Sequence, residues 1–229
     1  QRLQVSSCFL RETDILLLTF GTAWVYELKS TGKIVSNCHK IPADQFKRFR
    51  LTVPEIIHAC REMLEKLWLV NPKVKIIFTV SPIRHMKDGA VENQLSKASL
   101  LLAVDSLVKD YGNDRCVYFP AYELVMDELR DYRFYSEDMI HLAPVTVNFI
   151  WEKFMEWMLD DKTVGIMKEI ASLRNASDHR PFYRQSPEYL LFLRNMLEKT
   201  LFFSQKYNYL DFSVEKAYFA GEIEKSLVK

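Results

Sequence analysis

Short apolar runs alternate along the first half of the chain with longer segments in which apolar residues recur every three or four positions. Residues 14–21, 75–80 and 116–119 are short apolar runs bounded by polar residues, Gly or Pro, and they predict buried strands. Residues 52–71 and 91–111 show the helical spacing, and Thr52 and Glu55 form a capping box at the start of the first helix. Strands and helices in this alternating order predict a parallel sheet and an α/β fold.

The remaining segments complete this picture. We expect the end of a helix at 1–13, a small hairpin over 24–27 and 33–35, a loop at 36–50, a helical stretch at 121–130, a polar loop at 133–142 and an amphipathic helix at 146–159. Beyond residue 163 helical patterns dominate, with a break at 178–181 and helices at 187–206 and 213–228. We therefore expect an α/β domain over 1–160 and a helical C-terminal extension over 161–229. The extension would cover the core or engage a partner, for example as the contact surface of a homo-oligomer.

Composition excludes several classes of function. A hydrophobic content of 48% in 229 residues supports a sizeable core, and a net charge of +1 gives no general drive toward nucleic acid or an anionic membrane. No apolar run reaches membrane-spanning length. The four cysteines form no CxxC pair and the five histidines lack the spacing of a metal site, so we expect no metal and no cofactor. Scattered single cysteines favour a reducing compartment, and we expect a cytoplasmic protein.

The strongest candidate for chemistry is the pair Asp138 and His141 in the polar loop after the last predicted strand. Three residues of separation allow the carboxylate to reach the imidazole, fix its tautomer and stabilise its charged form during general base catalysis. The alternative is structural, with Asp138 capping the following helix and His141 in its first turn.

Three more candidates follow from the rule that ligands bind beyond the carboxyl ends of parallel strands. Arg84 could bind a carboxylate or phosphate, and His85 could be an acid, a base or a polar contact; the alternative is a solvated loop. Gly21 and Thr22 end the first strand, where backbone N–H groups can approach an oxyanion, or where the chain makes a tight turn with Trp24 in the core. Residues 37–40 are a substrate-side loop rather than a cysteine–histidine site, because adjacent side chains in an extended segment point in opposite directions.

Several long blocks resemble the GSCFA domain family, and together they span most of residues 14–160. The blocks are Leu18-Thr-Phe-Gly-Thr-Ala-Trp-Val-Tyr-Glu27, Asn37-Cys-His-Lys-Ile-Pro42, Val80-Ser-Pro-Ile-Arg-His85, Glu92-Asn-Gln-Leu-Ser-Lys97, Tyr118-Phe-Pro-Ala-Tyr-Glu123 and Asp127-Glu-Leu-Arg-Asp-Tyr-Arg-Phe-Tyr135 through His141. The family is bacterial and is similar to SGNH-type hydrolases. This resemblance implies a three-layer α/β/α sandwich with a parallel, flavodoxin-like sheet, and ester hydrolysis or acyl transfer.

The resemblance also assigns roles to residues. Asp138 and His141 match the Asp-x-x-His of the SGNH triad, so His141 would be the base and Asp138 its orienting group. Gly21 and Thr22 fall at the Gly-x-Asn-Asp strand end of SGNH enzymes, but Ala23 and Trp24 replace the Asn and Asp. Asn37, His39 and Asn93 are therefore candidates for the missing oxyanion donor.

The nucleophile is the part that the sequence does not supply. Ser6-Ser-Cys-Phe-Leu10 resembles the family's Gly-Ser-Cys-Phe-Ala motif, but no apolar strand precedes it and we interpret the likeness as accidental. The chain begins Gln-Arg-Leu-Gln without an initiator Met. We therefore expect the serine upstream of Gln1, which would leave this chain inactive and with an exposed sheet edge.

The leading hypothesis is a serine hydrolase or acyltransferase acting on a small-molecule, glycan or lipid ester, with His141 as general base. Arg84 and His85 would contact the substrate. The alternative is a non-catalytic ligand-binding module that kept the fold and lost the oxyanion Asn.

Overall fold

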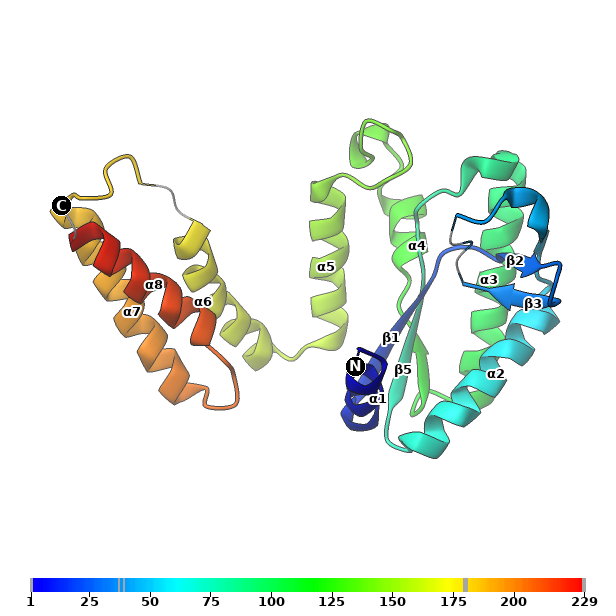
Figure 1. Ribbon diagram of the computed structural model, residues 1–229, viewed down its shortest axis with the longest axis horizontal. Coiled ribbons are helices and arrows are strands. Elements are labelled where there is room, and N and C mark those ends of the chain that lie inside the picture. Colours follow the sequence, from blue (N-terminus) through cyan, green and yellow to red (C-terminus); the bar gives the residue numbers. More distant parts are fainter. Residues whose placement is uncertain (1, 37, 39, 179–180, 228–229) are drawn as a thin grey trace. The chain divides into compact units, whose positions relative to one another are not determined.

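The computed structural model describes residues 2–36, 38, 40–178 and 181–227 (Figure 1). The chain divides into two compact units, Gln1–Lys153 and Phe154–Lys229. The first holds all the strands of the described residues, and the second is helical. Each unit is described by itself.

The first unit is built around a parallel sheet of three strands in the order β1-β5-β6. The strands are β1 (Ile15–Phe20), β5 (Lys75–Val80) and β6 (Cys116–Tyr118). The central strand β5 is buried along almost its whole length, as expected for a strand covered on both faces. The three strands predicted from apolar runs are therefore confirmed, and so is their parallel arrangement.

Helices lie on both faces of this sheet, which makes the unit a three-layer α/β/α sandwich (Figure 1). On one face α2 (Val53–Val70) and α3 (Gly89–Tyr111) pack against each other and against the sheet. On the other face lie the short helix α4 (Ala121–Glu123) and the part of α5 (Pro144–Met158) that belongs to this unit, residues 144–153 (Figure 1). The N-terminal helix α1 (Arg2–Glu12) leads into β1.

The core explains why these residues form these elements. The face of α2 and α3 that meets the sheet is mostly apolar, and it buries Leu64, Leu100, Val104 and Leu107 against the strands. Such burial contributes roughly 1.5–3 kcal/mol for each large side chain. The predicted capping box of α2 is present, because the backbone N–H of Thr52 donates to the Glu55 carboxylate.

A second, antiparallel sheet follows β1 and has the order β3-β2-β4. It consists of β2 (Trp24–Leu28), β3 (Lys33–Val35) and β4 (Phe46–Arg50). The predicted hairpin is confirmed, but the prediction of a loop throughout 36–50 was wrong. Residues 46–50 are Phe-Lys-Arg-Phe-Arg, which lacks the regular alternation of apolar and polar residues that indicates a strand, yet they pair with β2 in an antiparallel register.

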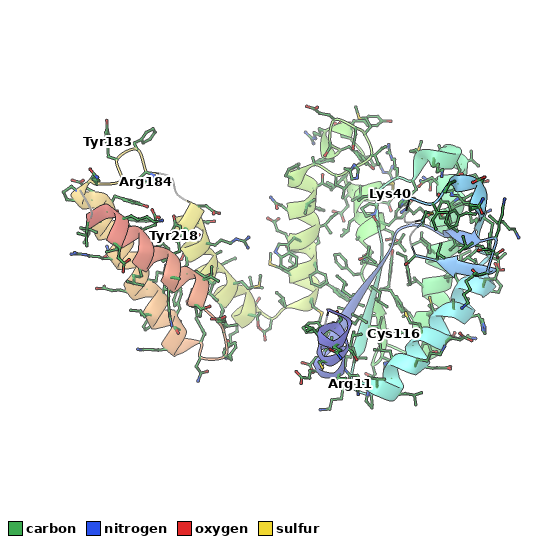
Figure 2. All side chains as sticks on the ribbon, in the orientation of Figure 1. Arg11, Lys40, Cys116, Tyr183, Arg184 and Tyr218 are labelled. Atoms are coloured by element: carbon green, nitrogen blue, oxygen red, sulfur yellow. The ribbon has the colours of Figure 1, made fainter. Side chains whose placement is uncertain are left out.

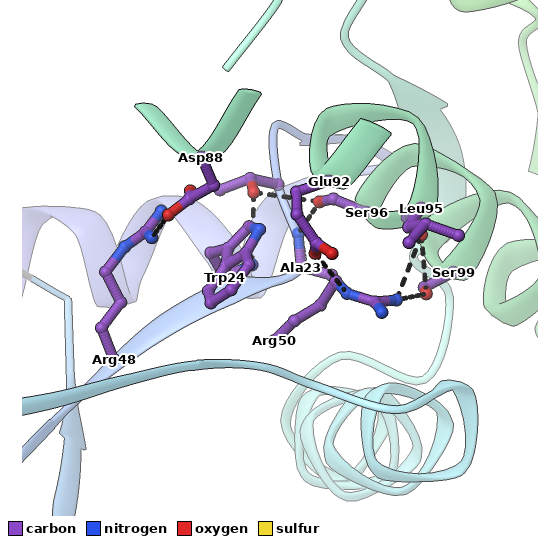
Figure 3. A network of polar contacts seen from close by, with 10 residues as sticks. Ala23, Trp24, Arg48, Arg50, Asp88, Glu92, Leu95, Ser96 and Ser99 are labelled. Carbon is purple, nitrogen blue, oxygen red and sulfur yellow. Dashed lines mark hydrogen bonds and ion pairs between the residues drawn. The ribbon is translucent and has the colours of Figure 1, made fainter. Parts of the chain in front are cut away.

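Two arginines of β4 fasten the small sheet to the start of α3 (Figure 3). Arg48 pairs with Asp88, and its guanidinium lies over the Trp24 ring at 4.3 Å from the centroid. Arg50 lies 3.4 Å from the Glu92 carboxylate and donates to Ser99 Oγ at 3.2 Å. These contacts fix the chain that leaves β1, and so they position the carboxyl edge of the parallel sheet.

The connections after β5 and β6 are irregular. They contain 3₁₀ turns at Met86–Asp88 and Tyr132–Phe134 and a π-helical turn at Leu124–Glu128, where a helical stretch was predicted. A single bridge between Tyr135 and Leu142 closes the loop that carries Asp138 and His141. This loop is therefore anchored at both ends.

The C-terminal unit contains α6 (Asp161–Asp178), α7 (Pro187–Lys206) and α8 (Ser213–Leu227). Leu173, Leu193, Phe203 and Phe219 form its core. The predicted helical C-terminal region is confirmed. In the part of the chain that the structure describes, none of the helices combines the length and the apolar character that crossing a membrane requires.

Candidate functional site

Asp138 and His141 lie in direct contact within the anchored loop. Nδ1 of His141 is 2.5 Å from Oδ2 of Asp138, while Oδ1 of Asp138 accepts from the backbone N–H groups of Ile140 and His141, each at 2.9 Å. The imidazole hydrogen bond first, and the two backbone N–H groups next, lower the pKa of Asp138 to about 2. The carboxylate therefore stays ionised at neutral pH and orients the ring.

The loop presents the pair to solvent. The side chain of His141 is 63% exposed and that of Asp138 is 46% exposed. Between them Met139 has a φ of +58°, an uncommon conformation for a residue with a side chain, and it lets the chain fold back on the carboxylate. The helix α5 begins only at Pro144, so Asp138 caps this turn and not the helix that follows.

Arg84 joins the loop after β5 to the loop of the Asp138–His141 pair. Its Nη1 donates to the carbonyl oxygen of Met139 at 3.4 Å, and its guanidinium lies over the Tyr135 ring at 4.4 Å from the centroid. The structure thus brings Arg84 beside the pair, as the shared sheet edge predicts.

His85 lies elsewhere, against Gly21 at the end of β1. A Cβ added at Gly21 would be 3.2 Å from Nε2 of His85, so glycine allows the ring its close approach. The backbone N–H of His85 donates to Oδ1 of Asn93 at 2.8 Å. Desolvation, followed by the charges of Lys97 and Arg48, lowers the pKa of His85, so the ring is neutral at pH 7. Arg84 and His85, although adjacent, therefore face different surroundings.

The turn at Gly21 and Thr22 is held by Ser96 of α3. Ser96 Oγ accepts from the backbone N–H of Ala23 at 2.7 Å and lies 3.0 Å from Thr22 Oγ1, which accepts from the N–H of Trp24 at 3.2 Å (Figure 3). Within the described residues, the N–H groups of Gly21 and Thr22 make no hydrogen bond. These two donors remain available to a ligand.

Lys97 is the residue that the sequence analysis missed. It is 1% exposed, and its Nζ donates to the carbonyl oxygens of Gly21 at 2.6 Å and Ser81 at 2.5 Å. Desolvation lowers its pKa to about 8. Lys97 thus joins the carboxyl ends of β1 and β5. The signal in the sequence was a charged residue on the buried face of α3, in line with Leu100 and Val104.

The remaining candidates are two of the predicted oxyanion donors and the cysteine thiols. Asn37 and His39 lie outside the described residues. Burial raises the pKa of the Cys60 and Cys116 thiols to about 11, which excludes them as thiolate nucleophiles at neutral pH; Figure 2 shows Cys116 inside the α/β unit. In the described ranges, no group of three or more His, Cys, Asp and Glu has the arrangement of a metal site.

The C-terminal unit has a cavity of its own, of about 530 Å³. It is lined by Arg184, which precedes α7, and by Tyr218 of α8. Its buried carboxylate, Glu222, is 2.7 Å from the ammonium of Lys225, so this charge is already paired. The Asp138–His141 pair, Arg84 and Lys97 lie in the first unit.

The family comparison also matches the chain in two parts. Residues 1–154 match the GSCFA family, and residues 170–225 match the C-terminal domain of GSCFA domain proteins. The chain belongs to the GSCFA family. The first match covers more than half of the chain, and it contains the parallel sheet, Arg84 and the Asp138–His141 pair. Searches of curated proteins and of solved structures found no match to this GSCFA protein.

Proposed function

We propose that this GSCFA protein hydrolyses an ester, or transfers its acyl group, with His141 as general base and Asp138 as the group that orients it. The observation that supports this best is the Asp138–His141 pair, in which the carboxylate contacts Nδ1 of a histidine side chain that is 63% exposed. A histidine held in this tautomer is suited to remove a proton from a hydroxyl group and to return it to a leaving group.

The proposed reaction has two steps. A hydroxyl nucleophile attacks the ester carbonyl while Nε2 of His141 takes its proton, and the proton then passes to the departing alcohol. Water, or a second alcohol in the case of transfer, releases the acyl group by the reverse sequence. Asp138 remains a carboxylate throughout, which is consistent with a pKa of about 2.

This mechanism requires a nucleophile close to His141. Among the described residues, no serine or threonine hydroxyl and no thiol is hydrogen-bonded to Nε2 of His141. We therefore propose that a serine from outside these residues supplies it. The outer edge of β1 has no strand neighbour in the described sheet, and it ends at Gly21, so a further strand could bring a serine to the same edge.

The oxyanion that forms in each step would accept hydrogen bonds from the N–H groups of Gly21 and Thr22. Preorganised backbone donors of this kind typically lower the barrier by roughly 3–4 kcal/mol each. Ser96 and Lys97 support this assignment, because they hold the turn and the carbonyl of Gly21 in place.

A non-catalytic binding module is the second candidate. It is favoured by Ala23 and Trp24, which stand where the related hydrolases carry Asn and Asp. The N–H of Ala23 is bonded to Ser96 and the Trp24 ring lies under Arg48, so both residues serve packing. A module of this kind would bind its ligand without turnover.

Labelling with a fluorophosphonate tests the two candidates. The protein should be produced as its gene encodes it, treated with the probe and mapped by mass spectrometry, with His141→Ala as the comparison and His58→Ala, an exposed histidine of α2, as the matched control. Label on one serine that is lost in His141→Ala and kept in His58→Ala supports the hydrolase. A folded protein that takes no label supports the binding module instead.

A further inference from the structure

A cavity of about 290 Å³ is lined by Arg84, the residue that also contacts the loop of the Asp138–His141 pair through the Met139 carbonyl. Its walls come from the loop after β5, the first turns of α3, and the segment that follows β6. The lining residues are Pro82, Arg84, Met86, Ala90, Asn93, Gln94, Tyr122, Met126 and Tyr132. We call it the Arg84 cavity. Its volume is at the lower end of the range for ligand pockets, so it fits a small group.

The two amides that line the Arg84 cavity, those of Asn93 and Gln94, have their oxygens in hydrogen bonds within the protein. Asn93 uses its Oδ1 to accept from the backbone N–H of His85, a group that can only donate, and this fixes the amide orientation. Gln94 uses its Oε1 to accept from the Tyr122 hydroxyl at 2.9 Å. Both amide oxygens are therefore occupied, and the amide nitrogens are left to meet a ligand.

Positive charge is added by Arg84 without a compensating carboxylate. No carboxylate of the described residues pairs with Arg84, and the lining contains no acidic residue. The nearest acids on the start of α3, Asp88 and Glu92, are paired with Arg48 and Arg50 (Figure 3). The Arg84 guanidinium is instead held by the Met139 carbonyl and by the Tyr135 ring, which leaves further N–H groups for a ligand.

We propose that the Arg84 cavity binds the anionic end of the ester substrate, a carboxylate or a phosphate, beside the Asp138–His141 pair. Arginine and two amide N–H groups match the acceptor atoms of either oxyanion, and the apolar walls of Pro82 and Met126 match a short carbon chain. That the bound anion belongs to a substrate rests on the proposed function, but the anion site itself does not depend on turnover.

Titration calorimetry with inorganic phosphate and with succinate, at pH 7 and low salt, tests the anion site directly. Arg84→Gln removes the charge and keeps much of the side-chain length, so we expect the Kd to rise about tenfold or more. Arg133→Gln is the matched control, because Arg133 is exposed, lies over Phe134 and does not line the cavity. Its Kd should equal that of the unsubstituted protein.

Gln94→Glu gives a second test that does not remove an arginine. Gln94 is on the exposed side of α3, and the Tyr122 hydroxyl can donate to a carboxylate as well as to an amide, so the fold should be kept. The new negative charge on the cavity wall should abolish anion binding. The probe that binds more tightly, phosphate or succinate, identifies which oxyanion the site prefers.

Turnover then separates this inference from the proposed function. In 4-nitrophenyl hemisuccinate the acyl chain ends in a carboxylate, and in 4-nitrophenyl butyrate it does not. We expect kcat/KM for the first ester alone to fall about tenfold in Arg84→Gln. Anion binding that depends on Arg84 without any esterase activity would support the site and contradict the hydrolase. The opposite result is ester hydrolysis that depends on His141, while anions bind Arg84→Gln and Arg133→Gln with equal affinity or bind neither variant. This result would overturn the anion site and leave the hydrolase in place.

Discussion

Lys97 offers a test of how the carboxyl edge of the sheet is held. The ammonium is buried, and it donates to the carbonyl oxygens of Gly21 and Ser81 at the ends of two neighbouring strands. A charge in this position costs free energy that a neutral amine would not. Lys97→Met removes both the charge and the two hydrogen bonds.

The size of the effect follows from the pKa of Lys97, which desolvation lowers from 10.5 to about 8. Between these values the unfolded chain binds more protons than the native protein, so Lys97 makes stability rise with pH. One pKa unit corresponds to about 1.36 kcal/mol, and between pH 7 and pH 9.5 the rise is about 2 kcal/mol. Cys60 and Cys116, whose pKa values are raised to about 11, also titrate in the alkaline range, so only a comparison of variants isolates the lysine.

Urea unfolding of the unsubstituted protein and of Lys97→Met at pH 7 and at pH 9.5 measures this difference. The destabilisation caused by Lys97→Met should be about 2 kcal/mol larger at pH 9.5, because the neutral amine keeps its hydrogen bonds without the cost of a buried charge. Lys109→Met, on the exposed side of the same helix, should show no such change. A destabilisation by Lys97→Met that is equal at the two pH values would refute the buried, partly neutralised state assigned to Lys97.

Three further changes test the site. Asp138→Asn should lower kcat for ester hydrolysis by about 10²–10⁴-fold with little change in unfolding free energy, because the exposed amide no longer orients His141. In the unsubstituted protein the acid limb of the pH–rate profile should lie well above pH 2, because Asp138, with a pKa of about 2, is ionised throughout that range and does not set the limb. Ser96→Ala should destabilise the protein by about 1–3 kcal/mol in urea, since the buried N–H of Ala23 loses its acceptor. Gly21→Ala should destabilise through contact with His85, and a double-mutant cycle with His85→Ala should show that the two costs are coupled.

The sheet and its helices could be predicted because their apolar residues repeat over long segments. Residues 76–80 are buried without interruption, and the capping box at Thr52 marks the start of α2. The strand at 46–50 was missed because its two aromatic and three basic residues do not alternate with a period of two, and its basic residues are typical of a solvated loop. In the fold these basic residues are partners of α3, a contact that depends on the tertiary structure.

Residues of the candidate site could be predicted where they are close in sequence or directly follow a buried strand. Asp138 and His141 were found because three positions separate them, and Arg84 because it follows a buried strand. Lys97 was missed because its partners at Gly21 and Ser81 are far away in sequence, and a lysine in an otherwise mixed helix is usually solvated. Hydrogen bonds of this range become visible only when the strand ends are placed side by side.

The side chains that make these long-range contacts all lie in the first turns of α3. Asn93 holds the backbone of the loop after β5, Gln94 holds the hydroxyl of Tyr122, Ser96 holds the turn after β1, and Lys97 holds the ends of both strands. Four residues within five positions of one helix thus position loops from three parts of the chain. Each of them contacts backbone or a supporting side chain. A substitution here should therefore change the geometry in which the Asp138–His141 pair meets its substrate, and so lower kcat.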